Sequence, residues 1–191
     1  MRSLLQFVGW ALCIVYTSVP LFWFMIHPFA DHWRVQRRNP YRVLLPGWIA
    51  MWILIGFATS HWRRIVLYEN PWTWIPGIGF LLCGFWLYHQ STRNFSGKQV
   101  GGFQEVLQNQ RQRLVISGIR GRIRHPMYLG HFCGLLGWSI GTGLAVCYGL
   151  TLFAVITGAI MIRMEDNELE LRFGEPYRIY RQQVPAFLPK I

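Results

Sequence analysis

Four long stretches of the sequence contain no Asp, Glu, Lys or Arg. They are Leu4–Ile26, Val43–Ser60, Pro71–Tyr88 and His131–Ile162, with 23, 18, 18 and 32 residues. A helix of about 20 apolar residues crosses the roughly 30 Å hydrocarbon layer of a membrane. Uncharged stretches of this length exclude an ordinary soluble domain and a disordered tail. We therefore expect residues 1–191 to form a single all-α integral membrane domain.

Acidic residues are also scarce, with 8 against 19 Lys and Arg, and the net charge is +11. Such a basic balance occurs in nucleic-acid-binding proteins, but Lys and Arg also accumulate in the cytoplasmic loops of membrane proteins. Since the uncharged stretches predict a membrane protein, we attribute the excess to these loops. We expect a bilayer and no nucleic acid as the partner.

The four cysteines lie inside the uncharged stretches, without the spacing of a metal or redox site. They are expected to be small buried apolar side chains, which excludes a disulfide scaffold. The histidines also lack the spacing of metal ligands, so no metal site is predicted. No Gly-x-Gly-x-x-Gly sequence follows a strand pattern, so a Rossmann cofactor domain is not expected.

The fourth uncharged stretch determines the expected topology. Its 32 residues would form a helix of about 48 Å, too long for one crossing. The glycine-rich segment Gly137–Gly143 predicts a turn. We therefore expect a hairpin of two short helices over 129–140 and 144–163, which brings the number of crossings to five.

The positions of the basic residues favour five crossings. With five, one face collects 16 of the Lys and Arg residues and the other face 3, whereas four crossings give 11 and 8. The positive-inside rule then places the N-terminus outside and the C-terminus in the cytoplasm, in the inner membrane if the cell is bacterial. The expected order is three helices in 1–89, a cytoplasmic loop in 90–128, the hairpin in 129–163 and a cytoplasmic helical tail in 164–191. Within the loop, Asn94–Gln112 is polar and glycine-rich, and we expect it to be mobile.

The end of the loop carries the first motif, which runs from Ser117 to Gly130. Pro126 disfavours helical geometry at His125 and suits the first turn of a helix. Arg124 and His125 should therefore lie just before a membrane helix, where free N–H groups attract anions. Tyr128 and Gly130 follow on the first turn, and Gly130 would let a ligand approach the backbone.

The second motif begins where the last membrane helix leaves the bilayer, near Arg163. The helix is expected to continue to a C-cap at Gly174, and Pro176 to begin another short helix. Glu165 would be costly at the membrane surface unless it is paired, and the hairpin returns it to the face that carries Arg124. We expect Glu168 and Arg172 to form an ordinary surface pair.

Together these motifs resemble the integral membrane methyltransferases of the isoprenylcysteine carboxyl methyltransferase and phospholipid methyltransferase superfamily. The first segment matches the Arg-His-Pro-x-Tyr-x-Gly signature of that family. Asp166 stands where the family has the second residue of a Glu-Glu pair. The residues that carry the resemblance are Leu114, Val115, Gly118, Arg124, His125, Pro126, Tyr128, Gly130, Glu165, Asp166, Leu169, Phe173, Gly174, Tyr177, Tyr180 and Pro189.

The resemblance implies S-adenosylmethionine as the methyl donor, bound at the cytoplasmic side between the two motifs. It implies cofactor binding by Arg124, His125, Tyr128, Leu129, Gly130, Glu165 and Asp166, with Arg124 and Glu165 also catalytic. It further implies that Tyr177, Tyr180 and Arg181 bind the substrate. The acceptor is expected to be a lipid or a lipidated small molecule that enters sideways from the bilayer.

The chemistry of the acceptor is left open by the residues. A prenylcysteine-like carboxylate is already a nucleophile, so the protein would only have to orient and desolvate it. The amine of a phospholipid would have to lose a proton, for which Glu165 is the nearest base. A non-catalytic lipid-binding protein that keeps the fold is a further alternative. A membrane reductase with a related C-terminal half and a small transporter rank below these.

Overall fold

The uncharged stretches form helices in the computed structural model, which describes residues 2–35, 39–93, 95 and 114–188. The main helices are α1 (Arg2–Phe24), α3 (Tyr41–Thr59), α4 (Trp74–Thr92), α7 (Pro126–Thr142), α8 (Ala145–Phe173) and α9 (Glu175–Gln183). Short helical segments join them: η1 (His27–Phe29), α2 (Ala30–Val35), η2 (Trp62–Arg64), η3 (Pro71–Thr73) and η4 (Gly118–Gly121). The all-α expectation is confirmed for the described ranges. Apart from Phe95, the expected mobile loop Asn94–Gln112 lies outside them.

Three segments in the described part of the chain are long and apolar enough to cross a membrane. They are Ser3–Phe29, Tyr41–Thr59 and Ala145–Phe173. The helix α7 has only 17 residues, and α4 has 19 that include glycine and tryptophan. Length and apolarity thus support three of the five expected crossings, and the other two remain a prediction.

The helices α7 and α8 form the expected hairpin; α7 is longer than predicted, whereas α8 ends before Gly174 as expected. The turn consists only of Gly143 and Leu144, and Gly143 has the left-handed φ of 67° that favours glycine. A Cβ atom on Gly143 would lie 2.5 Å from the carbonyl oxygen of Tyr68. The predicted turn over Gly137–Gly143 was therefore wrong at its start, because residues 137–142 are helical.

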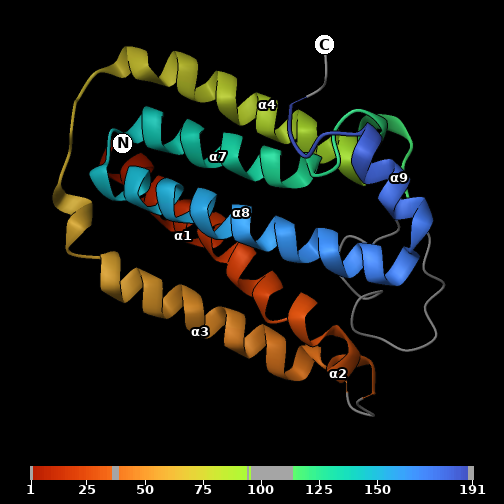
Figure 1. Ribbon diagram of the computed structural model, residues 1–191. Coiled ribbons are helices and arrows are strands. Elements are labelled where there is room, and N and C mark those ends of the chain that lie inside the picture. Colours follow the sequence, from red (N-terminus) through yellow and green to blue (C-terminus); the bar gives the residue numbers. More distant parts are fainter. Residues whose placement is uncertain (1, 36–38, 94, 96–113, 189–191) are drawn as a thin grey trace.

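The glycines of α7 instead allow close contact with α4, which runs beside it along its whole length (Figure 1). A Cβ atom on Gly84 would lie 2.7 Å from the carbonyl oxygen of Gly130, and one on Gly137 would lie 2.7 Å from that of Gly77. Glycine pairs of this kind let the backbones of membrane helices approach each other. We call these four residues the glycine seam.

The helix α1 packs between α3 and α8 (Figure 1). The hydroxyl oxygen of Ser18 accepts hydrogen bonds from the indole N–H groups of Trp48 (2.8 Å) and Trp52 (2.7 Å) on α3. The hydroxyl of Thr17 donates to the carbonyl oxygen of Leu150 on α8 at 3.2 Å. Small polar side chains of α1 therefore join the outer helix to the rest of the bundle.

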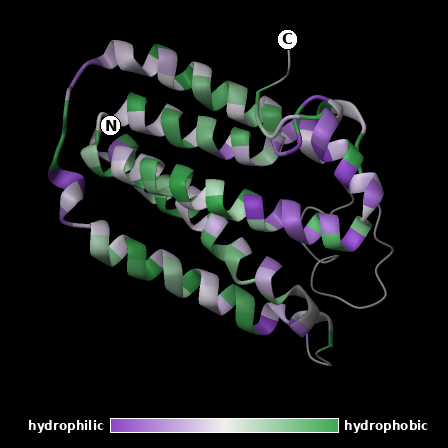
Figure 2. Ribbon diagram, in the orientation of Figure 1, coloured by the Kyte–Doolittle hydropathy of each residue, from purple (hydrophilic) through white to green (hydrophobic). Residues whose placement is uncertain are grey.

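The two ends of the bundle differ in polarity, as Figure 2 shows by the hydrophilic colouring of α9 and of the last turns of α8. Here η1, η4, the start of α7 and the end of α8 meet, and we call this the polar end. At the opposite end, the backbone N–H of Leu67 donates to the carbonyl of Gly143 (2.8 Å), and that of Ala145 to the carbonyl of Ile65 (3.0 Å). The hairpin thus returns the chain to the end from which α7 began.

The glycine seam gives a direct test of the fold. Gly84→Ala places a methyl group against the backbone of α7, so we expect a loss of about 1–3 kcal/mol from overpacking. A melting temperature measured in detergent should fall by several degrees. Gly79→Ala is the matched control on the same helix, because nothing lies within 4 Å of its Cβ position. Equal melting temperatures for the two variants would refute this account of the packing.

Candidate functional site

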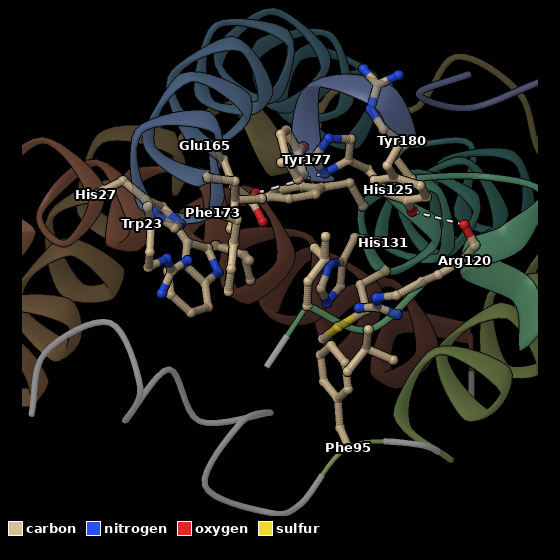
Figure 3. Close-up of a pocket in the computed structure, with 18 residues that line it drawn as sticks. Trp23, His27, Phe95, Arg120, His125, His131, Glu165, Phe173, Tyr177 and Tyr180 are labelled. Carbon is tan, nitrogen blue, oxygen red and sulfur yellow. Dashed lines mark hydrogen bonds and ion pairs between the residues drawn. The ribbon is translucent and has the colours of Figure 1, made fainter. Parts of the chain in front are cut away.

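A cavity opens at the polar end, between α1, η4, α7, α8 and α9. Its empty volume, which includes open solvent at the mouth, is about 1010 Å³. Figure 3 shows Glu165, Phe173, Trp23 and His27 on one side of it and Arg120 and Phe95 on the other, with His131 between them. The cavity is therefore large enough for a small molecule and has different side chains on its two sides.

Asp166 lies beside the cavity and is the centre of a hydrogen-bond network. It is buried, and its carboxylate accepts from the guanidinium of Arg124 at 2.8 Å and pairs with Nε2 of His125 at 2.8 Å. The hydroxyl of Tyr177 also donates to it, and Nε of Arg181 lies 3.8 Å away. One carboxylate on α8 thus binds the residues before α7 and the helix α9.

Arg124 connects the same elements through the C-terminal tail. Its Nη1 group donates to the carbonyl oxygens of Arg181 (3.0 Å), in the last turn of α9, and of Val184, which follows α9. The backbone N–H groups of Arg124 and His125 donate to the carbonyls of Pro185 (2.9 Å) and Ala186 (3.1 Å). Most of the guanidinium is therefore used inside the protein, although its buried Nε has no hydrogen-bond partner among the described residues.

Tyr177 and Tyr180 lie on α9 and line the cavity. The hydroxyl of Tyr180 donates to the carbonyl of Arg120 at 2.7 Å. Burial, together with the hydrogen bond to Asp166, raises the pKa of Tyr177 above its ordinary value. Burial raises the pKa of Tyr180 to about 12. Both hydroxyls therefore stay protonated near neutral pH and act as donors rather than as bases.

Glu165 precedes Asp166 but faces the cavity. Its Oε2 atom is shielded from solvent and has no hydrogen-bond partner among the described residues. Nδ1 of His125 lies 3.8 Å from it, beyond hydrogen-bonding distance. A buried carboxylate oxygen of this kind is costly unless a donor or a cation approaches it. Glu165 is thus the acidic group that the cavity offers to a ligand.

The predicted site residues divide into two groups. Those that line the cavity are Arg124, His125, Tyr128, Glu165, Tyr177 and Tyr180. Four others lie outside its wall: Asp166 in its network, Arg181 with Glu170 at 3.0 Å, Leu129 against an apolar cluster, and Gly130 in the glycine seam. Gly130 thus admits the backbone of α4, whereas the sequence suggested a ligand.

Several lining residues were missed by the sequence analysis. Trp23 and His27 stack at 5.2 Å between ring centroids, and Arg120, His131 and Arg172 come from three further segments. Arg120 and Arg172 lie within the two motifs, but nothing in the sequence distinguishes them as cavity residues, because only the tertiary fold brings all five together.

Glu168 and Arg172 form the expected pair, but its expected place at the surface was wrong. Their side chains are 14% and 7% exposed, their charged groups lie 3.0 Å apart, and Arg172 lines the cavity. Nδ1 of His27 lies 3.7 Å from the same Glu168 carboxylate. The packing of η1 against the end of α8 covers a pair that an isolated helix would expose.

Comparison with known proteins extends beyond the two motifs. A family model described as phospholipid methyltransferase matches residues 72–176, which also include α4. Protein-S-isoprenylcysteine O-methyltransferase of Homo sapiens is 32% identical over 152 residues, which is 70% of this chain and 50% of the relative. The Xenopus laevis protein of that name is 33% identical over 62% of this chain and 42% of the relative. The Schizosaccharomyces pombe protein is 30% identical over 60% of this chain and 48% of the relative. The chain thus spans about half the length of the curated relatives it matches.

The Asp166 network predicts a large difference between two acidic residues of α8. Asp166→Asn leaves Arg124 buried without its counter-charge, so we expect a loss of about 3 kcal/mol or more. Glu170→Gln removes the same charge from partly exposed pairs with Arg178 and Arg181, which contribute less than about 1 kcal/mol. Melting temperatures in one detergent should therefore fall by on the order of 10 °C for the first variant and little for the second. Similar losses would contradict the central place of Asp166.

Proposed function

Because the chain belongs to the phospholipid methyltransferase family and is an integral membrane protein, we propose that it transfers a methyl group to a lipidic acceptor. The donor in this proposal is S-adenosylmethionine, and the reaction takes place in the cavity of the polar end, at the cytoplasmic face. The preferred acceptor is a prenylcysteine-like carboxylate. This choice rests on the relatives named protein-S-isoprenylcysteine O-methyltransferase, which the chain matches over about half of their length.

The observation that carries the proposal is the carboxylate oxygen of Glu165 in the wall of the cavity, which accepts no hydrogen bond among the described residues and has only the distant His125 ring, at 3.8 Å, as an ion-pair partner. The donor has an ammonium and a sulfonium group, and either cation would compensate the charge of Glu165. Aromatic rings of Tyr128, Trp23 and Phe173 line the same cavity and can cover an adenine ring or the sulfonium. The residues present therefore fit such a donor.

When the acceptor is a carboxylate, the reaction needs no catalytic base from the protein. The bound donor would supply an electrophilic methyl group; its S–C bond breaks as an O–C bond forms, and no proton is transferred. Glu165 would bind and orient the cation, and the buried aromatic wall would exclude water. Arg124 would act mainly through Asp166, by fixing α9 and the start of α7 around the site.

An amine acceptor requires a base in addition. The carboxylate of Glu165 could take the proton in that case, whereas the raised pKa values of Tyr177 and Tyr180 exclude their hydroxyls as bases near neutral pH. The family model is described as phospholipid methyltransferase, so a phospholipid amine is the second candidate acceptor. A non-catalytic lipid-binding protein would bind the donor without methyl transfer to either.

The function can be tested with radiolabelled S-adenosylmethionine and a total lipid extract. We expect the label to enter a lipid product. Mild base should then release the labelled methyl group from that product, because it hydrolyses a methyl ester, whereas a methylated amine would retain the label. Calorimetry should also detect donor binding to the purified protein, and absence of binding at millimolar concentration would exclude the proposed donor. Donor binding without any labelled lipid would identify a non-catalytic protein.

Glu165→Gln should weaken donor binding at least tenfold, or about 1.4 kcal/mol, because it removes the charge opposite the cation. Glu175→Gln is the matched control, since this residue is 63% exposed and pairs with Arg178 at 2.9 Å, away from the cavity. It should leave the affinity unchanged. If Glu165→Gln kept the wild-type affinity, Glu165 would not belong to the donor site.

We further propose five crossings, by α1, α3, α4, α7 and α8, with the polar end in the cytoplasm. The 17 and 19 residues of α7 and α4 fall at the lower end of the range that spans a bilayer. The loops that carry most of the Lys and Arg leave α1, α4 and α8 at the polar end, as the positive-inside rule requires (Figure 1). The N-terminus is then outside.

Thiol labelling tests this topology. Cysteines introduced at the exposed positions Arg122 and Gln183 should react with an impermeant maleimide only after spheroplasts are opened. A cysteine at His61, exposed at the opposite end, should react in intact spheroplasts. The unsubstituted protein gives the background, because Cys13, Cys133 and Cys147 are buried and Cys83 lies on the apolar α4. Labelling of positions 122 and 183 from opposite sides would disprove the shared polar end.

A further inference from the structure

Arg120 lies in η4 and lines the side of the cavity away from Glu165 (Figure 3). Three contacts hold it there. Its Nη1 group donates to the carbonyl of Ser91 on α4 at 3.1 Å, its guanidinium lies 4.0 Å from the ring centroid of Phe95, and its own carbonyl accepts from Tyr180 on α9. Two of these contacts hold the guanidinium and the third holds the backbone of Arg120, so the side chain has one orientation before any ligand arrives.

In the part of the chain that the structure describes, Arg120 differs from the other arginines of the cavity in having no carboxylate beside its charge. Arg124 pairs with Asp166 at 2.8 Å, and Arg172 pairs with Glu168 at 3.0 Å. None of the ion pairs among the described residues includes Arg120. Burial lowers its pKa from the ordinary arginine value, and Glu165 across the cavity offsets this only in part. A fixed, half-buried guanidinium without a carboxylate partner is a site for an anion.

We propose that Arg120 binds the anionic group of the acceptor and thereby selects acceptors with a carboxylate at the reacting end. This inference rests on the proposed methyl transfer and adds to it the residue that determines acceptor specificity. A guanidinium has five N–H donors in a planar fork, and the structure uses Nη1 for Ser91, so the rest can hold a carboxylate. Leu114, Val115 and Met127 line the cavity as well and provide apolar contacts for a lipid chain.

The carboxylate of the donor is a less suitable ligand for Arg120. In S-adenosylmethionine the ammonium and the carboxylate are bonded to the same carbon atom, so both groups bind on one side of a cavity. If Glu165 holds the ammonium, the carboxylate lies on the same side of the cavity as Glu165 and His27, while Arg120 lies across from them (Figure 3). The anion that reaches Arg120 therefore comes from the second substrate.

The test compares two acceptor analogues, N-acetyl-S-farnesylcysteine and its carboxamide, which differ only in the anionic group. Wild-type protein in detergent should bind the carboxylate at least tenfold more tightly than the carboxamide. Arg120→Gln should lose this preference and raise the KM for the carboxylate at least tenfold, and Arg120→Lys should lie between the two. Both variants should keep the donor affinity within twofold, which also shows that they fold.

Arg122→Gln is the matched control, because Arg122 is exposed, carries the same charge two residues away and does not line the cavity. It should leave both the analogue preference and the donor affinity unchanged. Three results would overturn the role of Arg120: equal binding of the two analogues by wild type, a preference retained in Arg120→Gln, or a loss of donor affinity in that variant with the acceptor KM unchanged. Failure of the proposed function itself would differ, since donor binding and methyl transfer would then be absent from the wild-type protein.

Discussion

The site depends on one carboxylate, that of Asp166. It accepts from Arg124 and pairs with His125, both before α7, and it accepts from Tyr177 on α9, so three separate segments of the chain meet at one group. If these buried polar groups did not contact one another, each would carry a desolvation cost. Their hydrogen bonds to Asp166 offset most of that cost. Because these donors are used by Asp166, the groups left for a ligand are those that the network does not include, chiefly Glu165 and Arg120.

Helix contacts away from the cavity position the segments that meet at Asp166. The glycine seam brings α4 within backbone contact of α7, so the end of α4 lies beside η4 and the carbonyl of Ser91 reaches Arg120. The hairpin turn at Gly143 returns α8 to the same end as His125. The geometry of the cavity is therefore set by glycines that lie outside it, where no side chain could replace them without moving a helix.

Local backbone rules made part of this structure predictable. Pro126 begins α7 and Gly174, with φ of 63°, ends α8, as their sequence positions indicated. The meeting of the His125 segment with the acidic segment of α8 also followed, because a hairpin must return its second arm, but Arg124 pairs with Asp166 and not with Glu165, for which the sequence had suggested it. Glycine density was ambiguous, since the same residue suits a turn or a close helix contact, and only the presence of α4 decides between them. Arg120 could not be identified from sequence, because its importance depends on which carboxylates other arginines take.

The different roles of Glu165 and Asp166 follow from helix geometry. Consecutive residues of an α-helix project about 100° apart, so the two adjacent carboxylates have different surroundings, although Asp166 lies 2.8 Å from one ring nitrogen of His125 and Glu165 lies 3.8 Å from the other. In α8 the side chain of Asp166 points toward Arg124 and α9, and that of Glu165 points toward the cavity. An acidic pair at the exit of a membrane helix can thus supply one carboxylate to hold the fold together and one to bind a ligand. In the proposed reaction the cost of two neighbouring charges is met in different ways, by internal donors for Asp166 and by the cation of the methyl donor for Glu165.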